Sequence, residues 1–143
     1  MSELRVQPRV LGVDLGHVRV GLAISDELGL LAHPLDTLPR GNAAALIAQI
    51  ARDRNVSAII VGVPRHMSGG SGESAQDALA FVDKLRPLVG CDIHTIDERL
   101  STVAANRVLR DAGRKTHQTR GYVDQVAAQM ILQTYLDKQQ QRG

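Results

Sequence analysis

The amino-acid sequence predicts an α/β protein of three layers, in which a mixed β-sheet is covered by helices. Residues 10–26, VLGVDLGHVRVGLAISD, alternate apolar and other residues on both sides of a glycine-containing break, which is typical of a β-hairpin. From residue 42 onward, short apolar runs alternate with segments of helical periodicity, as in sheets with parallel strands. With 143 residues, the chain is expected to form a single domain, 1–143, with a core that needs no disulfide.

The opening hairpin carries a carboxylate on an otherwise bare face. Its strands are expected over residues 9–16 and 18–25, joined by a tight turn at Gly16 and His17. In the first strand every second residue is apolar, and these residues share one face: Leu11, Val13 and Leu15. The opposite face therefore presents Asp14 between two glycines.

The register of this hairpin determines what surrounds the carboxylate. A two-residue turn would place Arg19 across from Asp14 and Gly21 across from Gly12, leaving a face that a ligand can approach closely. Two interpretations follow. Asp14 is either an exposed carboxylate paired with Arg19, or a metal ligand or phosphate-site group that needs further acidic residues from elsewhere in the chain.

The rest of the chain supplies one more strand and then alternating helices and strands. Residues 30–38 are expected to form a third strand, in which Pro34 favours a sheet edge or a break. The later elements are expected as a helix at 43–55 with Asn42 as N-cap, a strand at 57–63, a helix at 74–88, a strand at 91–96, a helix at 102–113 and a long helix at 121–141. The segment 64–74, PRHMSGGSGES, is either a flexible connection at the sheet rim or a flap that faces a substrate.

Composition argues against several classes of function. The single cysteine, Cys91, excludes a disulfide framework, and the five histidines lack the close spacing of a zinc site. No apolar run reaches membrane-spanning length and no signal region is visible, so we expect a cytoplasmic protein without a membrane partner. Aromatic residues make up 2% of the chain, which argues against binding of single strands by base stacking.

The formal net charge of +2 permits a polyanionic partner without requiring one. Basic residues are concentrated before the last predicted helix: Arg107, Arg110, Arg114, Lys115 and Arg120. This concentration is either a solvated helix face and loop, or a surface that contacts phosphates.

Three carboxylates come from three different predicted elements. Asp14 lies in the first strand, Glu98 at the end of the last strand, and Asp124 in the first turn of the final helix. Two-metal phosphodiester chemistry needs such oxygen ligands to converge on hard divalent cations. Asp97 takes the role of Glu98 if the strand ends one residue differently, although we expect a structural role for Asp97. Asp26 is expected to form the turn after the second strand.

Four segments together resemble a known family. They are VDLGHVRVGLAISD (13–26), IIVGVPRHMSGGSGESA (59–75), DERLST (97–102) and YVDQVAAQMILQTYLD (122–137). In order and spacing they resemble the YqgF/RuvX family, bacterial proteins described as Holliday junction resolvase-like and as nucleases of pre-16S rRNA. The resemblance implies an RNase H-like fold, with a five-stranded sheet whose first three strands are antiparallel, and a divalent-metal nuclease.

The resemblance also implies roles for individual residues. Asp14, Glu98 and Asp124 match the family's three acidic positions, which makes them the catalytic residues and the ligands of Mg²⁺ or Mn²⁺, with two ions expected. The residues assigned to substrate binding combine the matched motif positions with the basic stretch: Arg19, Arg99, Ser101, Thr102, Arg114, Lys115 and Arg120. The motif positions among them hold either the phosphate backbone or the site's own architecture.

This sequence departs from the family pattern at three positions. His66 and Ser68 stand where the family usually carries asparagine and aspartate, and Tyr122 stands where a lysine is common, with Arg120 nearby. These changes affect substrate positioning more than chemistry.

The function that the resemblance implies is an endonuclease that processes the 5′ end of pre-16S rRNA. The alternative substrate is a four-way DNA junction in recombination and repair; its symmetric cleavage needs two sites and therefore a homodimer rather than a monomer. A phosphotransferase is disfavoured, because such folds need two related domains and the chain has no second D-x-G hairpin. A non-catalytic module that binds ribosomal precursors is the third class.

Overall fold

The computed structural model describes residues 7–64, 73–98 and 117–142, with side chains described within 7–64, 74–98 and 123–141. Its strands are β1 (Arg9–Leu15), β2 (Arg19–Ser25), β3 (Ala32–Pro39), β4 (Val56–Val63) and β5 (Asp92–Asp97). Its helices are α1 (Ala43–Asp53), α2 (Glu73–Leu85) and α4 (His117–Arg142), with single 3-10 turns at Arg40–Asn42 and Arg86–Leu88. The helix expected at 102–113 and the loop at 65–72 lie outside the described residues.

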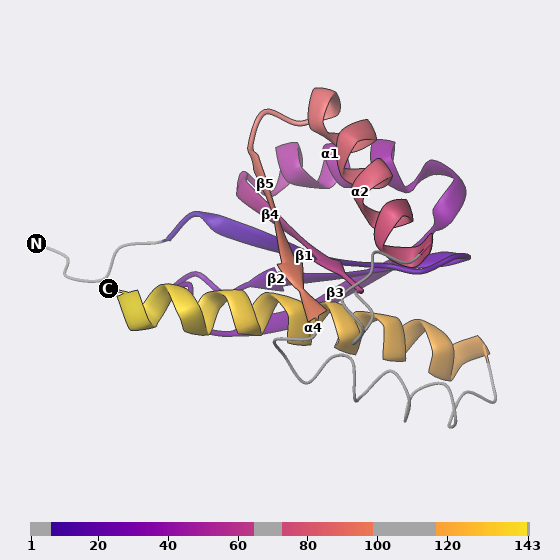
Figure 1. Cartoon of the computed structure of the whole chain (residues 1–143). Coiled ribbons are helices and arrows are strands. Elements are labelled where there is room, and N and C mark those ends of the chain that lie inside the picture. Colours follow the sequence, from indigo (N-terminus) through magenta and orange to yellow (C-terminus); the bar gives the residue numbers. More distant parts are fainter. Residues whose placement is uncertain (1–6, 65–72, 99–116, 143) are drawn as a thin grey trace, which may run out of the picture.

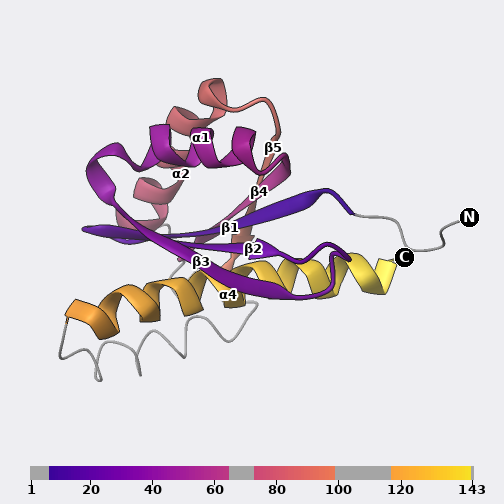
Figure 2. The same cartoon turned by 180° about the vertical axis from the view of Figure 1, so that it is seen from behind.

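The five strands form one mixed sheet in the order β3-β2-β1-β4-β5. The β1–β2 and β2–β3 pairs are antiparallel, whereas β4 pairs in parallel with β1 and with β5. Helices α1 and α2 cover one face and α4 covers the other, so the described parts form three layers (Figures 1 and 2). This arrangement confirms the predicted fold class, including the three antiparallel strands at the start.

The two faces bury separate hydrophobic clusters. Large aliphatic side chains from β1, β2 and β4 pack against α1 and α2, and they include Leu11, Val13, Leu22, Ile59 and Val61. The cluster under α4 contains Ala23, Ile60, Ile96, Ala128, Ile131, Leu132 and Leu136. Alternate residues of each strand therefore serve opposite layers, as the period of two in the sequence predicts.

The hairpin turn lies one residue further along the chain than predicted. Gly16 N donates to the Arg19 carbonyl at 2.9 Å, so His17 and Val18 form the turn. Among the described residues only Asn55 and Gly29 have a positive φ, so this turn needs no glycine at its centre. Gly16 is needed beside the turn instead, because a side-chain carbon there would lie 2.6 Å from the Arg19 carbonyl oxygen.

This displacement of the turn moves every cross-strand partner by two residues. Asp14 pairs with Gly21, and Gly12 pairs with Ala23. The predicted pairing of Asp14 with Arg19 is therefore wrong.

Helix α4 begins at His117, before the residue 121 that the sequence suggested. The predicted basic loop at 114–120 is thus partly helical, and Asp124 lies about two turns inside α4 instead of in its first turn. Gly121 marked the predicted start, but an internal glycine costs a helix only about 1 kcal/mol, which packing against the sheet offsets.

Strand β3 forms one edge of the sheet, as Pro34 predicted. The β2–β3 register shifts between Leu22, opposite Asp36, and Ala23, opposite Pro34, so β3 carries a bulge there. Glutamines spaced four apart on α4 bond to this edge: Gln125 to the Thr37 hydroxyl, Gln129 to the Ala32 carbonyl, and Gln133 to Ala32 N and the Leu30 carbonyl. Helix α4 is thereby held over β3 as well as over the sheet centre.

No helix within the described ranges is long and apolar enough to cross a membrane.

Candidate functional site

Three acidic side chains are buried in the described part of the chain. Asp14 is 2% exposed, Glu98 1% and Asp124 7%, and Ser25 is the only other polar residue buried among the described side chains. Burying a carboxylate is unfavourable unless hydrogen bonds or cations compensate its charge. Three buried carboxylates in one small domain therefore indicate a candidate functional site.

The three carboxylates converge because of two glycines. The β1–β4 register pairs Val13 with Val61, so the next step along each strand brings Asp14 beside Gly62. On its other side Asp14 pairs with Gly21 of β2. Asp14 therefore lies on the α4 face of the sheet, and the residue beside it on each neighbouring strand is a glycine.

The other two acids lie over these glycines. A side-chain carbon on Gly21 would overlap the Asp124 carbonyl group, and one on Gly62 would lie 2.5 Å from Ile131 Cδ1 and 3.2 Å from Glu98 Oε1. Asp124 and Glu98 therefore approach Asp14 from opposite sides, one from α4 and the other from the end of β5. The glycines make room for the carboxylates that flank Asp14.

The sheet face expected to be open to a ligand is covered by α4. A side-chain carbon on Gly12 would lie 2.7 Å from Leu132 Cβ and 2.9 Å from the Ala128 carbonyl oxygen. The glycines of β1 and β2 therefore admit the protein's own helix, and the prediction of an open face is wrong there. This close approach of α4 is what brings Asp124 to the strand that carries Asp14.

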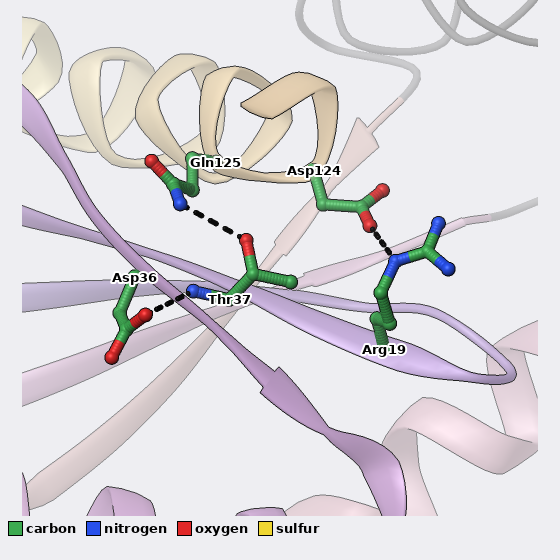
Figure 3. A network of polar contacts seen from close by, with 5 residues as sticks. All are labelled: Arg19, Asp36, Thr37, Asp124 and Gln125. Carbon is green, nitrogen blue, oxygen red and sulfur yellow. Dashed lines mark hydrogen bonds and ion pairs between the residues drawn. The ribbon is translucent and has the colours of Figure 1, made fainter. Parts of the chain in front are cut away.

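Arg19 forms an ion pair with the site. Its Nε donates to Asp124 Oδ2 at 2.9 Å, and the two side chains are 25% and 10% exposed (Figure 3). Arg19 is the first residue of β2, so its side chain starts beside the turn and reaches α4. The expected substrate-binding arginine thus contacts the acidic site itself.

A second contact sets the position of α4 beside Asp124. Gln125 Nε2 donates to Thr37 Oγ1 at 3.1 Å, and Thr37 N donates to Asp36 Oδ1 at 2.8 Å (Figure 3). Because Gln125 directly follows Asp124, this bond to β3 restricts rotation of the helix about its axis. Asp124 is held over the sheet from both sides, by Arg19 and through Gln125.

The donor set of the three carboxylates suits Mg²⁺ or Mn²⁺, since hard divalent cations prefer oxygen ligands. No group of three or more His, Cys, Asp or Glu in the described ranges is arranged so that it could hold a metal ion. Asp124 and Glu98 lie over the glycines beside Asp14, but the three carboxylates are not arranged around one ion position.

The exposure of their side chains distinguishes Glu98 from Asp97, the two candidates for the acid at the end of β5. Asp97 is the last residue of β5, pairs with Val63 and is half-buried, whereas Glu98 is fully buried beside Gly62. Glu98 is thus the residue that lies over Gly62, beside Asp14. Its assignment as a ligand remains a prediction.

Asp26 forms a turn, as predicted. Its Oδ1 accepts hydrogen bonds from Leu30 N at 2.8 Å and Leu31 N at 3.3 Å. Slight burial would raise the pKa of Asp26, but the backbone N–H groups of Leu30, Leu31 and Gly29 outweigh it and the pKa is lowered.

Several predicted substrate-binding residues lie outside the described residues, namely Arg99, Ser101, Thr102, Arg114 and Lys115. Arg120 lies in α4, and its side chain is not among those described.

Sequence reasoning missed two features of the site. Gly62, which Glu98 needs, interrupts the apolar run SAIIVGV, and this interruption was a usable signal. Arg40 braces the hairpin turn: its Nη1 donates to the Gly16 carbonyl at 2.8 Å, and its Nη2 pairs with Asp77 on α2 at 2.8 Å. No local pattern in the sequence marks Arg40 for this role.

The sequence also matches known proteins. The family model described as "RuvX: Holliday junction resolvase" matches residues 8–138. A protein of Roseiflexus sp. (strain RS-1) is 45% identical over 134 residues, covering 92% of this chain and 95% of the relative. A protein of Moorella thermoacetica is 44% identical over 138 residues, covering 94% and 99%. Both relatives carry the name "Putative pre-16S rRNA nuclease".

Among solved structures, Thermus thermophilus RuvC in complex with a Holliday junction substrate matches with a TM-score of 0.58 at 15% identity. The match covers 94% of this chain and 96% of that one. This likeness shows a shared fold and confirms the predicted RNase H-like class. Because the family model spans nearly the whole chain and the relatives exceed 40% identity, this protein belongs to the RuvX family of Holliday junction resolvases.

Proposed function

We propose that this chain is a divalent-metal-dependent endonuclease that acts on structured nucleic acid, and that its substrate is the 5′ region of pre-16S rRNA. The observation that carries the proposal is the convergence of three buried carboxylates at one end of the sheet. The relatives' shared name supports the substrate.

Asp14, Glu98 and Asp124 would hold the metal, either Mg²⁺ or Mn²⁺, and two ions are proposed. When bound, such ions activate water for attack on phosphorus and stabilise the leaving oxygen. Asp14 supplies a carboxylate fixed on a central strand, while Asp124 and Glu98 supply carboxylates from elements that the glycines allow to come close. Arg19 supplies a guanidinium at the rim, where it can bind a phosphate.

The experiment compares cleavage of a pre-16S 5′-leader RNA, a plain single strand and a four-way DNA junction, with Mg²⁺, Mn²⁺ or a chelator. We expect wild type to cut the leader RNA only with metal. Asp14→Asn should cut at least about a hundredfold more slowly, because loss of a metal ligand removes several kcal/mol of transition-state stabilisation.

The matched control is Asp26→Asn, which removes the same charge from an exposed turn. It should cut like wild type. Absence of cleavage with every metal and substrate, or equal rates for Asp14→Asn and wild type, contradicts the proposed function and favours a binding module.

The family description favours a second substrate, a four-way DNA junction. Symmetric cleavage of a junction needs two sites acting together, so this alternative requires a homodimer. Paired cuts in the junction, without cleavage of the leader RNA, would establish it in place of rRNA processing.

A further inference from the structure

Arg19 holds an oxygen of a proposed metal ligand. Its Nε lies 2.9 Å from Asp124 Oδ2 in a pair that is largely shielded from solvent, since the Asp124 side chain is 10% exposed. Shielding strengthens the attraction and removes water that would otherwise solvate the carboxylate. In this state the cation that compensates Asp124 is a guanidinium.

A metal ion and this guanidinium compete for the same oxygen. Two cations bound to one carboxylate oxygen repel each other, and the bond to Arg19 Nε occupies one of the directions from which Oδ2 can donate to a metal. Repulsion between the two cations therefore favours weakening of the pair when an ion takes Asp124 as a ligand.

The side chain of Arg19 can reach solvent when its ion pair with Asp124 breaks. It is the first residue of β2 and follows Val18, which is 70% exposed at the hairpin turn. The turn itself is braced, because Arg40 N donates to the Val18 carbonyl at 3.0 Å and Arg40 Nη1 to the Gly16 carbonyl at 2.8 Å. The backbone of Arg19 can thus stay in place while its long side chain turns toward solvent.

We propose that Arg19 neutralises Asp124 in the metal-free protein, is displaced by the divalent cation, and then binds a phosphate of the nucleic acid. The inference rests on the proposed metal site and adds an order of events to it. By linkage, a phosphate that engages Arg19 strengthens metal binding by the same factor by which the metal strengthens phosphate binding. Metal and substrate would then assemble the site together.

The test measures Mn²⁺ binding by isothermal titration calorimetry, without nucleic acid, in wild type, Arg19→Met and Arg9→Met. Arg9→Met is the matched control: it removes the same charge from the start of β1, where Arg9 pairs with the exposed Glu27 at 3.7 Å. We expect Arg19→Met to bind Mn²⁺ about fivefold more tightly than wild type, which corresponds to about 1 kcal/mol. Arg9→Met should match wild type.

Cleavage kinetics add a signature that a merely structural arginine would not produce. Arg19→Met should need less Mn²⁺ for its half-maximal rate and yet show a higher KM for the leader RNA. If Arg19→Met does not fold, as judged by circular dichroism, Arg19→Lys replaces it. Lysine keeps the charge but not the planar Nε contact, so a Mn²⁺ affinity between those of wild type and a neutral variant is expected.

The outcomes separate this inference from the proposed function. If Mn²⁺ binds wild type at least as tightly as Arg19→Met, displacement of Arg19 is wrong while the metal site stands. If Mn²⁺ binds none of the variants, the metal site fails and this inference fails with it.

Discussion

The two faces of the sheet are built from different kinds of residue. The face toward α1 and α2 carries branched aliphatic side chains such as Leu22 and Ile59, both fully buried. The face toward α4 carries Gly12, Gly21 and Gly62, which lie against Leu132 and Ala128, against the backbone of Asp124, and against Ile131 and Glu98, respectively. Both faces bury apolar side chains, but only on the second do glycines let the helix approach the strands closely enough to bring Asp124 to the site.

This difference shows how a helix can deliver a short side chain to a strand. An aspartate reaches only a few ångströms from its backbone, so Asp124 can approach Asp14 only if α4 lies almost on the sheet. A side-chain carbon on Gly21 would overlap the Asp124 carbonyl, which shows how close the helix lies. The site therefore depends on glycine as much as on the acids.

The largest expected effect comes from a cavity on the face toward α1 and α2. Ile59→Ala should lower the free energy of unfolding by about 2–5 kcal/mol, because it removes buried methyl groups from a tight cluster. Cleavage well below the unfolding temperature should change little, since no residue of the site packs on that face. Urea unfolding and initial cleavage rates measure the two quantities.

The neighbouring residue is the matched control for this prediction. Ile60 is equally buried and faces α4. Ile60→Ala should have a similar effect on stability but should reduce cleavage more, because the cavity loosens the helix that carries Asp124. Equal loss of cleavage in the two variants would contradict the division of the sheet into a stabilising and a functional face.

A smaller loss of stability with a larger loss of function is expected from Gly21→Ala. The added carbon would overlap the Asp124 carbonyl group, so α4 must shift. Such overpacking lowers stability by about 1–3 kcal/mol, and the shift moves Asp124 away from Asp14. Unfolding and cleavage should both be measured, and cleavage should fall even where the variant is fully folded.

Gly41→Ala controls for the general effect of replacing glycine. Nothing lies within 4 Å of a side-chain carbon at Gly41, so this variant should fold and cut like wild type. If Gly21→Ala cuts like wild type, α4 can shift without moving Asp124 away from Asp14, and the prediction is wrong.

Sequence periodicity was sufficient for the layers, because buried strands and amphipathic helices carry their pattern locally. Alternation alone places Leu11, Val13 and Leu15 on one face, and its residue type alone predicts a turn at Asp26. Pro34 marked an edge strand because it has no N–H to donate. These predictions needed only neighbouring residues, and the structure bears them out.

Alternation does not determine where a hairpin turn closes, and the contacts of α4 depend on residues far apart in the chain, so the sequence is insufficient for both. The turn consists of His17 and Val18, and not of Gly16 and His17, because the hydrogen bond between Gly16 and Arg19 closes it. The glycines suggested access for a ligand, and only the packed structure shows that α4 fills this space. The three acids were identified from residue type and resemblance, whereas the partner of Arg19 was not.

The smallest expected effect concerns the ion pair between Arg40 and Asp77, which links α2 to the hairpin turn beside the site. Asp77 on α2 accepts from Arg40 Nη2 at 2.8 Å and from Nη1 at 3.1 Å, and Arg40 also holds the hairpin turn beside the site. The hydrogen bonds from Arg40 lower the pKa of Asp77 below its ordinary value of 3.8, against the opposing effect of burial.

A lowered pKa in the folded state fixes the sign of the pH dependence. The stability that Asp77 contributes is fully present above pH 3.8 and is lost as the pH falls through the lower folded value. Because the Asp77 side chain is 34% exposed, solvent screening limits this contribution to at most about 1 kcal/mol. Asp77→Asn should therefore unfold at lower urea concentration than wild type at pH 7, and the difference between the two unfolding midpoints should shrink as the pH falls below about 4. The control is Asp83→Asn, which removes the same charge from an exposed position on α2. If Asp83→Asn lowers the urea midpoint as much as Asp77→Asn does, or if the difference from wild type grows in acid, the effect comes from net charge and not from the Arg40–Asp77 pair.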